Sequence, residues 1–109
     1  MRSGDKLYIV TRADLPPAQQ AVQAVHAARQ FAEEYAETEA AWFAASNYVA
    51  LLSVPTEGDL HELLDRASGR GVLAAGFREP DLASSLTAVA LEPRAKAMVR
   101  KLPLALGGR

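Results

Sequence analysis

Apolar residues along the chain fall into short runs and helical repeats that predict alternating strands and helices. Four of the runs are apolar on both alternating faces or nearly unbroken, which is typical of strands buried in a sheet. They cover residues 6–11, 47–54, 72–77 and 85–91. Helical spacing follows over 17–37 and again after Pro55, and Pro93 opens a last helix. The order β-α-β-α-β-β-α predicts a single α/β domain over residues 1–109, with the first two strands parallel.

The first predicted helix has two distinct faces. Its apolar arc, which is expected to pack on the sheet, consists of Ala18, Ala21, Val22, Val25, Ala28 and Ala32, and is widened by Ala24, Phe31 and Tyr35. A polar row beside it has the spacing i, i+4, i+7 and i+11, and is formed by Gln19, Gln23, His26 and Gln30. Because these side chains project in a common direction, the row is suited to hold a polar ligand. After the helix, Trp42 and Phe43 are expected to close the edge of the core.

The second predicted helix has recognisable start and stop signals. Thr56 and Asp59 have the spacing of a capping box, with Asp in place of the usual Glu, and Gly69 is expected to take the left-handed conformation after the helix. The stripe expected to be buried consists of Leu60, Leu63, Leu64 and Ala67. His61 lies away from that stripe and is expected to be exposed, and the chain from Pro103 onward is expected to fray.

Composition narrows the classes of function. The net charge of -1 and the pI near 6.1 argue against the broad positive field of non-specific nucleic-acid binders, so any contact with nucleic acid must be local. The absence of cysteine excludes disulfides, thiolate zinc sites and a cysteine nucleophile, and we expect neither a metal nor a cofactor. No apolar run approaches the roughly 20 residues that span a bilayer, and the N-terminus has no signal-peptide pattern. We therefore expect a cytoplasmic protein without a membrane partner.

Polar residues near the predicted strand ends are the candidates for chemistry. In α/β sheets, ligands bind beyond the carboxyl ends of parallel strands, which here brings together the loop after the first strand, the start of the first helix and the loop after the third strand. The candidates in these segments are Arg12, Asp14, Gln19, Gln23, His26, Glu79 and Asp81. Each also has a purely structural interpretation, such as a helix-start residue for Asp14 or a polar turn for Glu79 and Asp81. The chain has no phosphate loop, nucleophile elbow, dinucleotide fingerprint or HExxH motif.

Four segments, taken in order, resemble a known family. They are TRADL after the first strand, VQAVHAA in the first helix, LLDRASGRG in the second helix and LTAVALEP at the fourth strand. Together they resemble the type II peptidyl-tRNA hydrolase family, the archaeal and eukaryotic type, over roughly residues 6–104. The resemblance implies a three-layer α/β/α fold with a four-stranded mixed sheet. It also implies hydrolysis of the ester that joins a peptide to the terminal ribose of tRNA.

The resemblance carries over to particular residues. Arg12 and Asp14 match the family's R-x-D-L turn, and Gln23 and His26 match its Q-x-x-H-A helix motif. Gln19 stands where the family has a lysine, and a glutamine can hydrogen-bond a phosphate or a carbonyl but supplies no positive charge.

A second departure from the family concerns the loop after the third strand. The family's D-A-G-x-T-Q segment is replaced by a shorter one in which Glu79 or Asp81 would act as the base or orient the water. Ser85 and Thr87 match hydroxyl positions on the strand that follows.

We therefore expect a hydrolase that acts on peptidyl-tRNA. The catalytic candidates are Gln23, His26, Glu79, Asp81 and Thr87, and the candidates for binding substrate are Arg12, Asp14, Gln19 and Ser85. The alternative is a protein that kept the fold, lost the chemistry, and recognises a tRNA end or a protein partner. The missing lysine and the near-neutral charge favour this alternative. The small size and apolar-rich surface also predict a symmetric homodimer.

Overall fold

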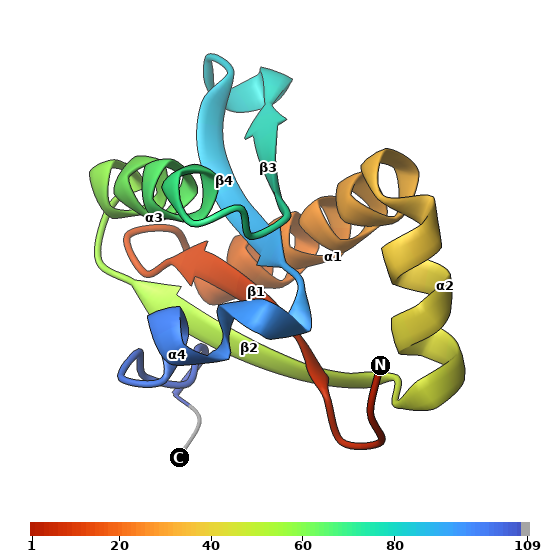
Figure 1. The fold of residues 1–109 in the computed structure, drawn as a ribbon. Coiled ribbons are helices and arrows are strands. Elements are labelled where there is room, and N and C mark those ends of the chain that lie inside the picture. Colours follow the sequence, from red (N-terminus) through yellow and green to blue (C-terminus); the bar gives the residue numbers. More distant parts are fainter. Residues whose placement is uncertain (108–109) are drawn as a thin grey trace.

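The structure is a computed structural model that describes residues 1–107, and its centre is a four-stranded mixed sheet (Figure 1). The strands are β1 (Lys6–Arg12), β2 (Tyr48–Val54), β3 (Ala74–Glu79) and β4 (Ser85–Leu91), arranged in the order β2-β1-β4-β3. β1 and β2 are parallel, whereas β4 is antiparallel to both β1 and β3. The α/β class, the four strands and the parallel first pair are thus confirmed.

Helices cover both faces of the sheet, as expected for a three-layer fold. They are α1 (Pro17–Glu34), α2 (Ala36–Ala45), α3 (Glu57–Gly69) and α4 (Lys96–Val99), with 3₁₀ turns η1 (Pro80–Leu82) and η2 (Pro93–Ala95). The first helix ends earlier than predicted because Tyr35 leaves the helical conformation, and α2 follows it as a separate element. The predicted last helix is reduced to η2 and a single turn, α4. Among residues 1–107, no helix is both long and apolar enough to cross a membrane.

The two faces of the sheet are packed differently. α1 lies on one side and α3 on the other (Figure 1). On the α1 side, β3 and β4 contribute alanines, Ala75, Ala88 and Ala90, so the helix backbone can lie close to the sheet. On the α3 side, leucines and valines of the strands pack against leucines of α3. The short side chains therefore hold α1, the helix with the polar row, close against β3 and β4.

The face that α1 buries agrees only in part with the predicted apolar arc. Ala24 and Phe31, at the margin of that arc, are buried as predicted, but Val22 and Val25 at its centre are exposed. The other buried residues of α1 are Gln20, Gln23 and Ala27. Periodicity misplaced this face because it counts a glutamine as polar and therefore outward. Inside the protein, the amides of both buried glutamines have hydrogen-bond partners, which removes most of the cost of burying them.

Two other local expectations need correction. Trp42 is buried and donates a hydrogen bond from Nε1 to the carbonyl of Tyr48, as a residue that closes the core should, but Phe43 is 62% exposed. The capping box of Thr56 and Asp59 is confirmed. The prediction for Gly69 is wrong. Gly69 is the last residue of α3, and the glycine with a positive φ is Gly71, two residues later.

The C-terminal segment is ordered along the sheet edge, contrary to the predicted fraying. The carbonyl of Pro103 accepts a hydrogen bond from Ser53, and the N–H of Ala105 donates to Leu51, so this segment pairs with the outer edge of β2. An unpaired edge strand exposes backbone donors and acceptors, and the pairing covers part of it. The rest of the predicted fraying end, Gly108 and Arg109, lies outside the described residues.

Candidate functional site

Gln23 is the centre of a hydrogen-bonded cluster between α1, β3 and β4. Its side chain is 0% exposed, and its Nε2 donates to Glu79 Oε1 at 2.9 Å. Its Oε1 accepts a hydrogen bond from Thr87 Oγ1 at 2.7 Å. Because a carboxylate only accepts, the amino group of Gln23 must face Glu79, which fixes the orientation of the amide. The proximity of Gln23 and Glu79, expected from the sequence, is confirmed.

A β-bulge directs Thr87 toward this cluster. Phe77 pairs with Ala88 and Arg78 pairs with Leu86, so Thr87 is an extra residue on β4. Strict alternation would place residues 86 and 88 on one face, but Leu86 packs on the α3 side and Ala88 on the α1 side. The extra residue allows the Thr87 hydroxyl to reach Gln23 on α1.

His26 and Gln19 flank Gln23 on the same helix. The imidazole of His26 stacks on the ring of Phe77, with 4.6 Å between centroids and 19° between planes. Gln19 is half-buried, and its Oε1 lies 3.4 Å from Gln23 Nε2. The predicted polar row thus faces β3, and its first three members, Gln19, Gln23 and His26, contact one another or the side chains of that strand.

Arg12 and Asp14 form a separate group on the α3 side of the sheet. Arg12 makes a bidentate pair with Asp14, with Nε to Oδ1 at 2.8 Å and Nη2 to Oδ2 at 3.0 Å. The hydrogen bonds to Asp14 raise the pKa of Arg12, and the same bonds lower the pKa of Asp14. The structure therefore does not bring these two residues to Gln23. They meet the first residue of α3, Glu57, whose Oε1 is 3.8 Å from Arg12 Nη1.

Glu57 and Arg12 bind the two polar backbone groups of Leu86, its N–H and its carbonyl. The Leu86 N–H donates to Glu57 Oε2 at 2.9 Å, and the Leu86 carbonyl accepts from Arg12 Nη1 at 3.2 Å. His61, predicted to be merely exposed, lies with its Nε2 3.1 Å from Glu57 Oε2. The hydrogen bond from Leu86, followed by the one with His61, lowers the pKa of Glu57. Because Leu86 directly precedes Thr87, we call this pair of contacts the Leu86 clamp.

The remaining predicted residues lie near the cluster without hydrogen bonds to it. Asp81 is exposed in η1, and Ser85 is half-buried at the start of β4, where it pairs with Glu79 in the β-ladder. Of the two acidic candidates, only Glu79 hydrogen-bonds to Gln23. Within residues 1–107, no three metal-ligating side chains come together.

Two structurally important residues were missed at the sequence level. Gln20, which stands beside the predicted polar row, accepts from Thr11 Oγ1 at 3.0 Å and donates to the carbonyl of Leu15 at 2.7 Å, so it fixes the loop before α1. Glu57 was overlooked because a glutamate in the first turn of a capped helix already suits the helix dipole. The position of Glu57 directly after the cap residue Thr56 could have indicated that its side chain lies at the end of the sheet.

The cluster has the parts that hydrolysis of an ester requires. Glu79 is half-buried, and among residues 1–107 its second oxygen, Oε2, makes no hydrogen bond, so it can accept a proton from a water. The amide N–H groups of Gln19, which is half-buried on the same helix face, can donate to a developing oxyanion.

Residues 5–106 match the model of the family described as Peptidyl-tRNA hydrolase PTH2. Among curated proteins, none matches the chain. The family match covers nearly the whole length of the chain.

Proposed function

Because the chain belongs to the PTH2 peptidyl-tRNA hydrolase family, we propose that it hydrolyses the ester between a peptide and the terminal ribose of tRNA. The observation that carries the proposal is the hydrogen bond of 2.9 Å from buried Gln23 to Glu79. It leaves one carboxylate oxygen free at a position where three elements of the fold meet.

Glu79 is the proposed general base. It takes a proton from a water at Oε2, and the resulting hydroxide attacks the carbonyl carbon of the ester. The amide N–H groups of Gln19 donate to the oxyanion that forms. The N–H groups of Gln23 are directed at Glu79 and Gln19, so Gln23 positions these two side chains. The bond from the carbonyl carbon to the ribose oxygen then breaks, and that oxygen takes the proton from Glu79.

Thr87 and His26 position the reacting groups in this proposal. The Thr87 hydroxyl holds the Gln23 amide in the orientation that presents its amino group to Glu79. His26 packs on Phe77, two residues before Glu79, and so supports the same strand. Arg12 and Asp14 act from the opposite side of the sheet through the Leu86 clamp, and their predicted contact with substrate would require tRNA to reach that side as well.

The test is turnover of peptidyl-tRNA by the purified protein. Glu79→Gln keeps the size of the side chain but removes the base, and kcat should fall by about a hundredfold or more. Asp81→Asn examines the other acidic candidate and should have a much smaller effect. Glu33→Gln, on the exposed side of α1, is the control for loss of one negative charge.

The second candidate is a binding protein without activity. Gln19 favours it, because the family has a lysine there and the chain lacks that positive charge. If the protein leaves peptidyl-tRNA intact while a known hydrolase cleaves it in the same assay, the hydrolase proposal is refuted. Binding of tRNA at low salt without turnover would then support the binding protein.

A further inference from the structure

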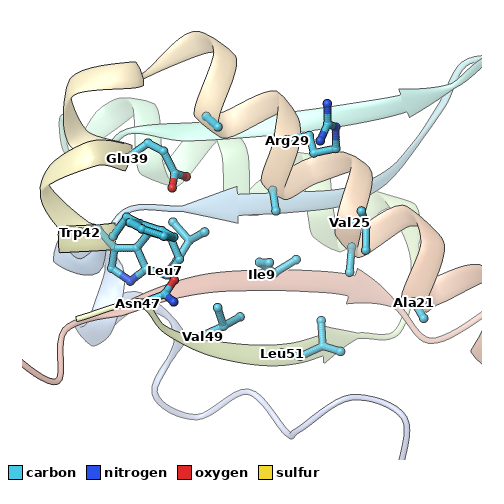
Figure 2. A pocket seen from close by; sticks show the side chains of 14 residues that line it. Leu7, Ile9, Ala21, Val25, Arg29, Glu39, Trp42, Asn47, Val49 and Leu51 are labelled. Atoms are coloured by element: carbon cyan, nitrogen blue, oxygen red, sulfur yellow. The ribbon is translucent and has the colours of Figure 1, made fainter. Parts of the chain in front are cut away.

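The two flanks of α1 differ in what they face. One flank borders an apolar groove of about 570 Å³ over β1 and β2, with Ile9 and Val25 among its lining residues (Figure 2). The other flank carries the Gln23 cluster, which consists of Gln23, Glu79 and Thr87. Among residues 1–107, no side chain that lines the groove hydrogen-bonds to this cluster. The geometry of the cluster therefore depends on how β3 and β4 are held.

The start of β4 has no backbone neighbour on the side of β1. The pairs between β1 and β4 end at Thr11 and Ala88. The same ladder, continued by two residues, would place Ala13 opposite Leu86, but the N–H of Ala13 donates to the carbonyl of Val54 at the end of β2. The N–H and the carbonyl of Leu86 thus need other partners, because an unpaired backbone group away from water is costly.

Side chains of Glu57 and Arg12 take the place of the missing strand. The Leu86 N–H donates to Glu57 Oε2, and the Leu86 carbonyl accepts from Arg12 Nη1. The capping box places Glu57 as the first residue of α3, on the face of the sheet opposite to α1 (Figure 1). One turn further along α3, His61 contacts the same carboxylate oxygen. The Leu86 clamp is therefore built from a helix start behind the sheet.

The clamp acts on the residue next to the β-bulge. Ala88 faces α1 and Leu86 faces α3, and the bulge lets Thr87 reach the α1 side as well. If the bulge moved to Leu86, Thr87 would pair with Arg78. Alternation from Ala88 would then turn the Thr87 hydroxyl to the α3 side, away from Gln23. The position of the bulge thus decides whether the cluster forms.

We propose that Glu57 is a positioning residue for the hydrolysis: its hydrogen bond with the Leu86 N–H keeps the bulge at Thr87. The effect on turnover rests on the proposed function, whereas the effect on the bulge does not. Glu57 acts through Leu86 and Thr87 and touches no reacting group. The reach of its oxygen matters more than its charge, because the Leu86 N–H needs an acceptor, whereas Arg12 Nη1 lies 3.8 Å from Glu57 Oε1, beyond hydrogen-bond distance.

The first test compares two substitutions of Glu57 in the turnover of peptidyl-tRNA. Glu57→Asp keeps the charge and suits the first turn of a helix, but its oxygens fall one methylene short of the Leu86 N–H. Glu57→Gln loses the charge but keeps the length and an oxygen that accepts this N–H. We expect kcat to fall about tenfold in Glu57→Asp with little change in KM, and Glu57→Gln to retain most of the wild-type kcat. A role in helix capping or in charge alone would give the opposite order.

Glu92 provides a matched control at the other end of β4. Its Oε2 accepts from the Leu73 N–H at 2.7 Å and lies 2.7 Å from Arg94 Nη2, so it too binds a backbone N–H beside an arginine. Glu92 directly follows β4 and has no contact with the bulge at its start. Glu92→Asp should lower the free energy of unfolding while kcat stays at the wild-type value. Urea unfolding of this variant and of Glu57→Asp shows that both are folded under the conditions of the assay.

The second test needs no turnover. Nuclear Overhauser effects between side-chain protons of Thr87 and Gln23 report whether Thr87 faces α1. They should be present in the wild-type protein, in Glu57→Gln and in Glu92→Asp, and absent or much weaker in Glu57→Asp. If the wild-type protein leaves peptidyl-tRNA intact, the proposed function fails, and these effects still decide whether Glu57 fixes the bulge.

Three results would overturn the proposal. The first is a Glu57→Asp variant that keeps the contact between Thr87 and Gln23. The second is a Glu57→Gln variant that loses as much kcat as Glu57→Asp does. The third is an equal loss of kcat in Glu92→Asp and Glu57→Asp, which would reduce the effect to a general loss of stability.

Discussion

The side chains that meet at Gln23 show how a buried polar network can fix a single reactive geometry. Gln23 satisfies a hydroxyl and a carboxylate at once, and each partner comes from a different strand. Within a buried site, such hydrogen bonds are costly to leave unmade, so the arrangement is specific. The free carboxylate oxygen of Glu79 is therefore held in place by residues that do not react.

At the residue scale we predict that Thr87→Val impairs both stability and turnover. The substitution leaves the buried oxygen of Gln23 without a donor, which should cost about 1–3 kcal/mol in the free energy of unfolding. The amide can then reorient and misplace Glu79, so kcat should fall about tenfold. Urea unfolding and a peptidyl-tRNA turnover assay measure the two effects.

Thr11→Val is the matched control for this prediction. Thr11 also donates its hydroxyl proton to a buried glutamine, Gln20, at 3.0 Å, but outside the cluster. It should lose a comparable amount of stability while kcat stays close to wild type. Equal losses of kcat in the two variants would show that the hydroxyl of Thr87 has no special part in turnover.

The Leu86 clamp gives a prediction about pH. Because the folded protein lowers the pKa of Glu57, the stability that this carboxylate contributes is present above its unfolded value of about 4.5 and is lost as the pH falls through the lower, folded value. Glu57→Gln should therefore be less stable than wild type at pH 7, and the difference should shrink in acid. Urea unfolding at several pH values measures it, with Glu62→Gln on the same helix as the control for charge. A difference between Glu57→Gln and wild type that stays constant down to the lowest pH would argue against the clamp.

At the element scale, β3 lies against β4 and α3 so closely that only a glycine fits at position 76. An added Cβ at Gly76 would lie 2.8 Å from Leu86 Cδ1 and 3.0 Å from Leu64 Cδ1. Leu86 is fully buried and cannot turn away without displacing its neighbours. The glycine thus keeps in register the two strands that carry Glu79 and Thr87.

We predict that Gly76→Ala lowers the free energy of unfolding by about 1–3 kcal/mol, because it overpacks this contact. Turnover should fall as well, since the shift of Leu86 reaches Thr87 directly. Gly69→Ala is the control: no atom lies within 4 Å of its added Cβ, and alanine suits a helix better than glycine. In thermal unfolding, Gly76→Ala should have a lower melting temperature than wild type, whereas that of Gly69→Ala should be equal to or above the wild-type value.

At the scale of the whole molecule, charge sets how tRNA is held. The net charge is -1, and Arg12, which donates to the carbonyl of Leu86 on β4, is already paired with Asp14. The protein can therefore neutralise few phosphates of a bound tRNA. The logarithm of its tRNA affinity should then depend only weakly on the logarithm of salt concentration.

Gln19→Lys should restore one phosphate contact near the cluster. We expect tighter binding of tRNA and a salt slope that steepens by about one unit. Gln30→Lys, which adds the same charge further along the same helix, is the matched control and should change the slope less. A filter-binding titration at several salt concentrations provides both slopes, and equal slopes in the two variants would argue against tRNA lying near Gln19.

The sequence by itself determined the four strands, the parallel pairing of the first two and the capped start of α3. These features follow from short apolar runs and from hydrogen bonds between residues close in the chain, so local pattern is enough to predict them. It also placed Gln23 and Glu79 at one end of the sheet, because strand ends and helix starts converge there in any α/β fold.

Only the tertiary structure decided which face α1 buries, where the strands bulge and which residues share a hydrogen bond. Gln20 and Gln23 are buried because distant partners satisfy their amides, and periodicity cannot register partners from another strand. Thr87 reaches Gln23 only through the extra residue in β4, a register shift that arises from pairing with β3. Arg12 and Asp14 lie on the other side of the sheet for the same reason: the face that a side chain occupies depends on long-range register, which is absent from the local sequence.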